Sequence, residues 1–166
     1  EKGGIIKEDT PVVIGESLPE TLAVFKNLAS RCRAPIYFAD KQPFPDRTAQ
    51  LKGAYQKKNI RTVQMAVQVL NGLGWKLSEE SLEKGLQKVM TNTGLRGRWE
   101  ILQESPKVIC DTAHNAEGLG YTMGQLRQEK GDRRHLVIGV VSDKDLPKIL
   151  PLFPTEATYY FTQRLV

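Results

Sequence analysis

Cysteine and aromatic residues are scarce in this chain of 166 residues, and each shortage argues against certain classes of protein. The two cysteines, Cys32 and Cys110, do not have the spacing of a metal-binding motif and are too few for a disulfide framework. Cys110 ends an apolar run, so we expect a buried free thiol in a reducing cytoplasm. The sequence has no apolar stretch of membrane length and no signal peptide, so we expect neither a membrane partner nor secretion.

The charge balance is modestly basic, at +5, and apolar residues make up 40% of the chain, which is enough for a core. A small basic excess suits polyanionic ligands such as nucleotides, and it also suits an ordinary solvated surface. Proteins that bind nucleic acids usually gather lysine and arginine on one face, with aromatic side chains among them. Here the basic residues are scattered and aromatics are only 7%, so we expect no nucleic-acid partner. A non-catalytic nucleotide-binding module remains an alternative from a different class.

Apolar runs alternate with helical periods along the chain, which predicts an α/β fold with a parallel, doubly wound sheet. A linker at Thr91–Gly94 divides it into residues 1–93, the tail of one α/β domain, and residues 94–166, most of a second. Both ends of the sequence suggest a fragment of a longer protein. The expected strands are 11–15, 35–39, 99–102, 107–110, 135–141 and 158–161, and the expected helices are 19–32, 59–73, 78–90, 116–129 and one from about 146.

Residues 108–115, with the sequence VICDTAHN, form the most informative segment. An apolar run ends in Asp111, and His114 follows just before a helical period begins. In open α/β sheets, ligands bind beyond the carboxyl ends of strands, where the N–H groups of the next helix favour anions. The pattern therefore predicts a nucleotide site. The alternative is a helix-capping Asp111 and a surface His114.

Four other segments are candidates with equally simple alternatives. Lys2 in EKGGIIK (residues 1–7) is functional only if it is desolvated. Asn59 either caps a helix or reads a planar base edge with its amide. Arg98 either lies on the surface, stacked on Trp99, or grips phosphate with two N–H groups. Residues 139–145, GVVSDKD, are a second strand end that leads into a helix.

These segments together, in this order and spacing, resemble the folylpolyglutamate synthases and dihydrofolate synthases of the Mur ligase superfamily. Residues 1–7 resemble the family string EKAGIIK, and Gln56 and Asn59 fall in its HQ..NA segment. Arg98 falls in its GR.E segment, and residues 111–115 resemble its DGAHN signature. Residues 139–145 resemble its G...DKD string. The resemblance identifies a P-loop-type central domain followed by a Rossmann-like C-terminal domain.

The chain departs from the family pattern at several places. Gly3 replaces alanine, Tyr55 stands where histidine is usual, and Thr112 replaces a glycine at the turn. The P-loop string G-x-x-x-x-G-K-[ST] and the metal ligands that precede the EK string do not occur. We therefore expect the chain alone to have negligible ligase activity.

The resemblance implies an ATP-dependent ligase that adds L-glutamate to folate or dihydropteroate through an acyl phosphate, with Mg²⁺. Lys2 would be the carbamylated lysine that supplies oxygen ligands to Mg²⁺. Asn59 would contact adenine, Arg98 would bind phosphate oxygens, and Asp111 and His114 would line the nucleotide and metal region, with His114 also catalytic. A monomer with small-molecule substrates is expected. The nearest alternative is another Mur-type ligase, such as a peptidoglycan-precursor or cyanophycin enzyme.

Overall fold

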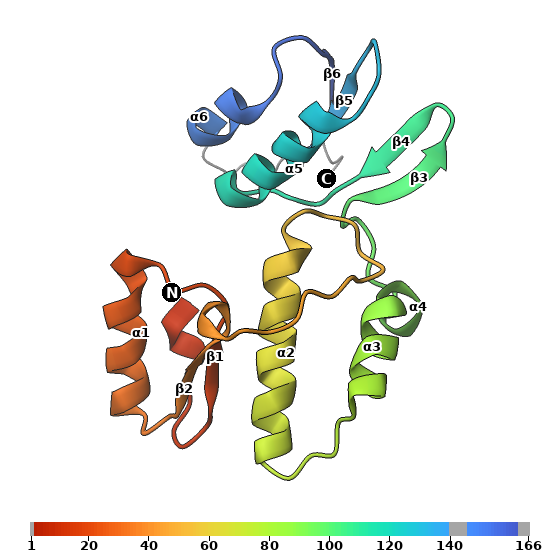
Figure 1. Ribbon diagram of the computed structural model, residues 1–166. Coiled ribbons are helices and arrows are strands. Elements are labelled where there is room, and N and C mark those ends of the chain that lie inside the picture. Colours follow the sequence, from red (N-terminus) through yellow and green to blue (C-terminus); the bar gives the residue numbers. More distant parts are fainter. Residues whose placement is uncertain (1, 140–145, 163–166) are drawn as a thin grey trace. The chain divides into compact units, whose positions relative to one another are not determined.

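A computed structural model describes residues 2–139 and 146–162, and it shows two compact units (Figure 1). Unit 1 contains residues 1–50 and 56–94, and unit 2 contains residues 51–55 and 95–166. The chain therefore passes between the units at three points, at residues 50–51, 55–56 and 94–95. Each unit is described below by itself.

Unit 1 has a strand–helix–strand core. Strand β1 (Val12–Ile14) pairs in parallel with β2 (Ile36–Phe38), and α1 (Pro19–Arg31) is the crossover between them. Pro19 is the first residue of α1, where its missing N–H costs no helical hydrogen bond. The expected parallel pairing is confirmed here. The other elements are η1 (Lys2–Ile5), η2 (Ala39–Lys41), α2 (Gln56–Gly72), α3 (Glu79–Gln87) and α4 (Val89–Thr93).

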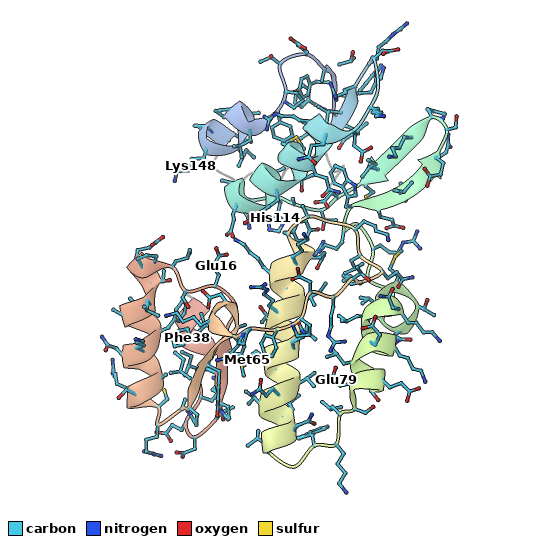
Figure 2. The ribbon with its side chains drawn as sticks, viewed as in Figure 1. Glu16, Phe38, Met65, Glu79, His114 and Lys148 are labelled. Atoms are coloured by element: carbon cyan, nitrogen blue, oxygen red, sulfur yellow. The ribbon has the colours of Figure 1, made fainter. Side chains whose placement is uncertain are left out.

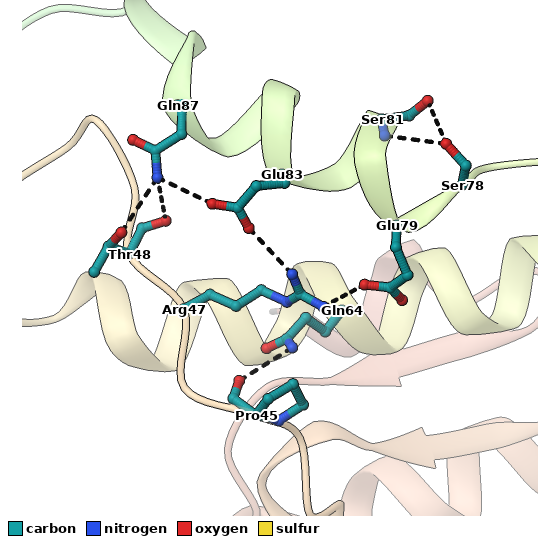
Figure 3. A network of polar contacts seen from close by, with 9 residues as sticks. All are labelled: Pro45, Arg47, Thr48, Gln64, Ser78, Glu79, Ser81, Glu83 and Gln87. Atoms are coloured by element: carbon teal, nitrogen blue, oxygen red, sulfur yellow. Dashed lines mark hydrogen bonds and ion pairs between the residues drawn. The ribbon is translucent and has the colours of Figure 1, made fainter.

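Helices α2 and α3 pack through an apolar cluster of Ile60, Leu82 and Leu86, in agreement with the helical period of the sequence. A polar network beside this cluster joins α3 to the loop before α2 (Figure 3). In this network the Arg47 side chain, 19% exposed, pairs with Glu79 and with Glu83, whose Oε2 lies 3.1 Å from Nη1. The loop is thus held to α3 by charge as well as by apolar packing.

Two expected boundaries in unit 1 are wrong. The single helix expected at 78–90 divides into α3 and α4, and Lys88 N bonds to Gly85 O, three residues back, where α3 ends. Thr91–Thr93, expected in the linker, form the end of α4, and Gly94 stops this helix with φ +68°. Ser78 caps α3 as expected, since its hydroxyl accepts from Ser81 N at 3.1 Å.

The described residues of unit 2 contain one helix of 13 residues, α5 (Ala116–Gln128), and four strands. Strands β5 (His135–Ile138) and β6 (Thr158–Phe161) pair in parallel, with α6 (Leu146–Ile149) and η3 (Leu150–Leu152) between them. Strands β3 (Glu100–Glu104) and β4 (Lys107–Cys110) instead form an antiparallel hairpin. The expectation of parallel pairing fails for β3 and β4 because only two residues connect them, and a parallel crossover needs about a dozen.

Candidate functional site

The candidate site in unit 2 consists of two turns that hydrogen-bond to each other. The first turn, Gly97–Trp99, precedes the hairpin, and the second, Asp111–Asn115, follows it. The two turns are joined at Thr112, whose N–H and hydroxyl both donate to Gly97 O, at 2.9 and 3.1 Å. Gly97 and Thr112, 15 residues apart in the sequence, therefore belong to one structural site.

The first turn has an unusual backbone. Gly97 has φ +68°, and a Cβ at this position would lie 2.6 Å from Thr112 Cγ2. Trp99 has φ +52°, which is uncommon for a large side chain, and is only 4% exposed. The strand expected to begin near Trp99 begins at Glu100 because the left-handed conformation of Trp99 is incompatible with a strand.

Glu100 stabilises the first turn through a hydrogen bond to its backbone. Its Oε2 accepts from Gly97 N at 2.8 Å, and its Oε1 lies 2.5 Å from Arg96 Nη2. The Gly97 N–H holds the pKa of the Glu100 carboxyl below its usual value; burial opposes this effect and Arg96 adds to it. Glu100 is therefore ionised at neutral pH, and its bond to Gly97 is charge-assisted.

Arg98 is half-buried and anchored at one end of its guanidinium. Nη1 donates to Gly97 O at 3.2 Å and also to the Thr112 hydroxyl. Among the described residues, Nε and Nη2 have no hydrogen-bond partner. A guanidinium held through Nη1, with Nε and Nη2 left to donate, is suited to an oxyanion.

Asp111 is the centre of the hydrogen-bond network between the turns. Oδ2 accepts from Trp99 N at 2.7 Å and from the Tyr55 hydroxyl at 3.2 Å. Oδ1 accepts from Ala113 N at 2.8 Å and from the Thr122 hydroxyl at 3.2 Å. An ionised carboxylate accepts about four hydrogen bonds, so this one is fully used by its own chain. The geometry gives Asp111 a positioning role between the two turns, and its contact with a nucleotide or metal stays a prediction.

His114 is exposed at the start of α5 (Figure 2). Nδ1 lies 3.0 Å from Thr112 O, and since a carbonyl only accepts, Nδ1 carries the proton. In the neutral ring, Nε2 is therefore an acceptor that faces away from this bond. Asn115, not Asp111, caps α5, because its Oδ1 accepts from Gly118 N at 2.8 Å.

The start of α5 adds a partial positive charge beside these turns. The first N–H groups of a helix lack carbonyl partners within the helix and favour anions. Glu117, in the first turn of α5, opposes this effect with its negative charge. Arg98, His114 and the start of α5 are groups that can attract an anion, and the negative charge of Glu117 weakens this attraction.

The remaining candidates lie elsewhere. Asn59 belongs to unit 1, and α2 begins three residues before it, so Asn59 is within the first turn of the helix and is not its cap. Its Nδ2 donates to Gln56 Oε1 at 3.0 Å. Lys2 begins η1, and its side chain is outside the described part of the structure. The segment Ser142–Asp145 likewise falls outside the described residues.

No magnesium site is found in the part of the chain that the structure describes. Residues 2–139 and 146–162 contain no group of three His, Cys, Asp or Glu side chains that could hold a metal ion. The side chain of Lys2, the expected metal ligand, lies outside the described residues.

Sequence reasoning missed two polar partners of Asp111. Thr122 is only 6% exposed, and a buried hydroxyl on an otherwise apolar helix face requires a partner, which is the signal that identifies it. Tyr55 was expected only as a departure from the family's histidine. Its hydroxyl bond to Asp111 depends on tertiary structure and has no signal in the local sequence.

Residues 97–164 match the family model described as the Mur ligase, glutamate ligase domain. This part of the chain is therefore similar to a Mur ligase domain. The match begins at Gly97, the first residue of the site. The dihydrofolate synthase/folylpolyglutamate synthase of Bacillus subtilis is 28% identical over 181 residues, covering 95% of this chain and 41% of the relative. The resemblance to this family is therefore confirmed.

Solved structures agree with this assignment. The folylpolyglutamate synthase of Thermotoga maritima is 28% identical, with a TM-score of 0.68 over 96% of this chain and 42% of that one. An Escherichia coli enzyme solved with DHPP and ADP is 24% identical, with a TM-score of 0.74 over 96% of this chain and 40% of that one. The α/β fold class, with a Rossmann-like C-terminal domain, is confirmed. The chain spans about two fifths of the length of the curated relatives it matches.

Within the described residues, no helix is both long and apolar enough to cross a membrane.

Proposed function

We propose that this chain is part of an ATP-dependent amide ligase that adds L-glutamate to folate or dihydropteroate through an acyl phosphate. The observation that carries the proposal is the match of residues 97–164 to a glutamate ligase domain, beginning at the turn that presents Arg98. The ADP and DHPP held by the Escherichia coli neighbour support nucleotide and pteridine ligands. We further propose a cytoplasmic monomer that acts on small molecules, with neither nucleic acid nor membrane as a partner.

The site residues would serve a reaction in which an anion attacks an anion. Such a reaction needs positive charge placed where negative charge develops. The free N–H groups of Arg98 would bind phosphate oxygens, and the start of α5 would add its dipole. His114 Nε2, once protonated, would donate to a phosphate oxygen. Asn59 would contact adenine, while Mg²⁺ and its link to Lys2 remain predictions from the resemblance. The network around Asp111 would hold these groups in place.

Titration of the isotope-labelled chain with the ATP analogue AMPPCP tests nucleotide binding. We expect amide chemical shifts to change at residues 97–99 and 112–118, with weak affinity because the chain has no P-loop string. Arg98→Ala should weaken binding about tenfold, since a charge-assisted bond to phosphate is lost. Arg133→Ala is the matched control, because Arg133 is an exposed arginine of the same unit. Equal weakening by both variants would leave only nonspecific charge attraction.

His114→Ala should affect function and leave folding nearly unchanged. The side chain is exposed and makes one bond, to the carbonyl of Thr112. We expect the melting temperature to change by less than about 2 °C. In a form of the protein that includes a P-loop segment, ATP-dependent glutamate addition should fall about tenfold. A large loss of melting temperature with normal turnover would contradict this assignment.

The competing function is ligation of an amino acid to another Mur-type substrate. The glutamate ligase domain belongs to the Mur ligases, so the domain match alone is compatible with it. Thermal-shift measurements with pteroate, folate and a UDP-sugar on the P-loop-containing form separate the two. Stabilisation by the UDP-sugar alone would reject the folate assignment.

A further inference from the structure

Residues Leu51–Tyr55, here named the strap, belong to unit 2 although the chain on both sides belongs to unit 1. The strap follows the loop that carries Arg47 and ends where α2 begins at Gln56. A connecting segment with no regular secondary structure needs other partners for its backbone N–H and C=O groups. In the strap, α5 supplies the partners of two such groups, Ala54 N and Lys52 O.

Gln125 of α5 provides two of them. Its Oε1 accepts from Ala54 N at 2.8 Å, and its Nε2 donates to Lys52 O at 3.3 Å. One side-chain amide thus binds a donor and an acceptor of the strap, as the backbone of a neighbouring strand would. Both atoms of the amide head are used, which fixes its orientation.

Tyr55 provides the second anchor. Its ring folds back over Gly53, where a Cβ would lie 2.6 Å from Tyr55 Cε1. The ring meets Tyr121 of α5 edge-on, at 6.4 Å between centroids. The hydroxyl then donates to Asp111 Oδ2 at 3.2 Å. The last residue of the strap is therefore one of the four groups that saturate the Asp111 carboxylate.

We propose that Gln125 and Tyr55 are positioning residues that link docking of the strap to the shape of the Asp111 turn. When the strap is docked, the Tyr55 hydroxyl occupies Oδ2 together with Trp99 N, and the carboxylate is held between the two turns. When the strap is released, Asp111 loses one donor and the turns loosen. The consequence of this linkage for nucleotide binding at the two turns rests on the proposed function.

Hydrogen exchange of the ligand-free protein tests the linkage. The Ala54 amide should be protected in the wild type, and Gln125→Ala should raise its exchange rate about tenfold. The same variant should raise exchange about twofold to threefold at the Trp99 and Ala113 amides, which bond to Asp111. Gln128→Ala, an exposed glutamine on the same helix, should change none of these rates. No protection at Ala54, or no effect at Trp99 and Ala113, would overturn the proposal.

Two further variants separate positioning from general stability. Gln125→Glu keeps the acceptor for Ala54 N but cannot donate to Lys52 O, so it should restore about half of the lost protection at Ala54 on a logarithmic scale. Tyr55→Phe removes only the hydroxyl and should raise the exchange rate of the Ala113 amide. Tyr37→Phe in unit 1 should leave this rate unchanged. Identical rates for Gln125→Glu and Gln125→Ala, or equal effects of the two tyrosine variants, would contradict the proposed contacts.

The proposed function is tested separately by adding AMPPCP. Nucleotide bound at the turns should further slow exchange at Ala54 in the wild type, and Gln125→Ala should abolish this added protection. If AMPPCP changes no exchange rate while the ligand-free results hold, the nucleotide proposal fails and the link between strap and turn stands. If AMPPCP protects the turns but not Ala54, the linkage is wrong.

Discussion

Asp111→Ala should lower the free energy of unfolding of unit 2 by about 4 kcal/mol. The substitution removes the acceptor of two backbone and two side-chain donors at once. Each bond to a charged acceptor is worth about 1.5–3 kcal/mol, and partial access of water to this half-buried carboxylate recovers some of the sum. The loss should exceed that caused by Glu100→Ala, because the Glu100 carboxylate accepts from one backbone N–H, that of Gly97.

The two tryptophans make the measurement specific to unit 2. Trp99 is 4% exposed in unit 2, and Trp75 is 62% exposed in unit 1. In a Trp75→Phe background, denaturant unfolding followed by fluorescence reports Trp99 alone. Asp132→Ala, at an exposed carboxylate of the same unit, should change stability by less than about 0.5 kcal/mol. A small effect of Asp111→Ala, together with loss of AMPPCP binding, would instead favour direct ligand contact.

Asp111→Asn discriminates further because it is nearly isosteric. The amide oxygen of asparagine still accepts from two of the four donors. Its NH₂ group replaces the other oxygen, so the remaining two donors face a donor and lose their acceptor. We therefore expect Asp111→Asn to lose most of the stability that Asp111→Ala loses. Near-wild-type stability would show that shape, and not the carboxylate, holds the turns together.

Gly97→Ala should lower the stability of unit 2 by about 3 kcal/mol. The φ of +68° costs an L-residue about 1–2 kcal/mol. The new Cβ would also lie 2.6 Å from Thr112 Cγ2, a methyl group on a side chain whose hydroxyl is fixed by Arg98 and Gly97. The two costs add because the backbone cannot relieve the contact without breaking the bond from Thr112 N.

Two variants divide this cost into its parts. Thr112→Ser keeps the hydroxyl and removes the methyl, so in that background Gly97→Ala should cost only the φ penalty, about 1–2 kcal/mol. Gly120→Ala is the control: this glycine lies within α5 with open space around it and should gain about 0.5–1 kcal/mol. If Thr112→Ser restores nothing, the contact with the methyl is not the cause.

The sequence predicted the elements whose boundaries are set by interactions between residues close together in the chain. Pro19 marks the start of α1, Ser78 caps α3, and strand β6 spans Thr158–Phe161 as expected. The order of the motifs placed the site at the turn after residue 110, and the structure brings Arg98, Asp111 and His114 together there. These features follow from capping, periodicity and apolar runs within a few residues of sequence.

Features that depend on tertiary contacts were not predicted. The contact of Asp111 with a nucleotide, expected because an acid at a strand end is typical of such sites, stays a prediction. The sequence did not indicate that its oxygens accept from four groups of its own unit. The same carboxylate accepts from the backbone N–H of Trp99, which has a left-handed conformation, and from the hydroxyl of Tyr55. Neither contact could be inferred from neighbouring residues in the sequence. Only coordinates reveal that a polar side chain is already satisfied.

The contact between Gly97 and Thr112 has an evolutionary consequence. A chain with threonine at 112 cannot acquire a side chain at 97 without steric conflict. With glycine at 112, as in the family signature, that conflict disappears and only the backbone preference at 97 remains. A side chain at 97 is therefore opposed by two costs in this chain and by one in a chain with glycine at 112, so Thr112 makes Gly97 harder to replace.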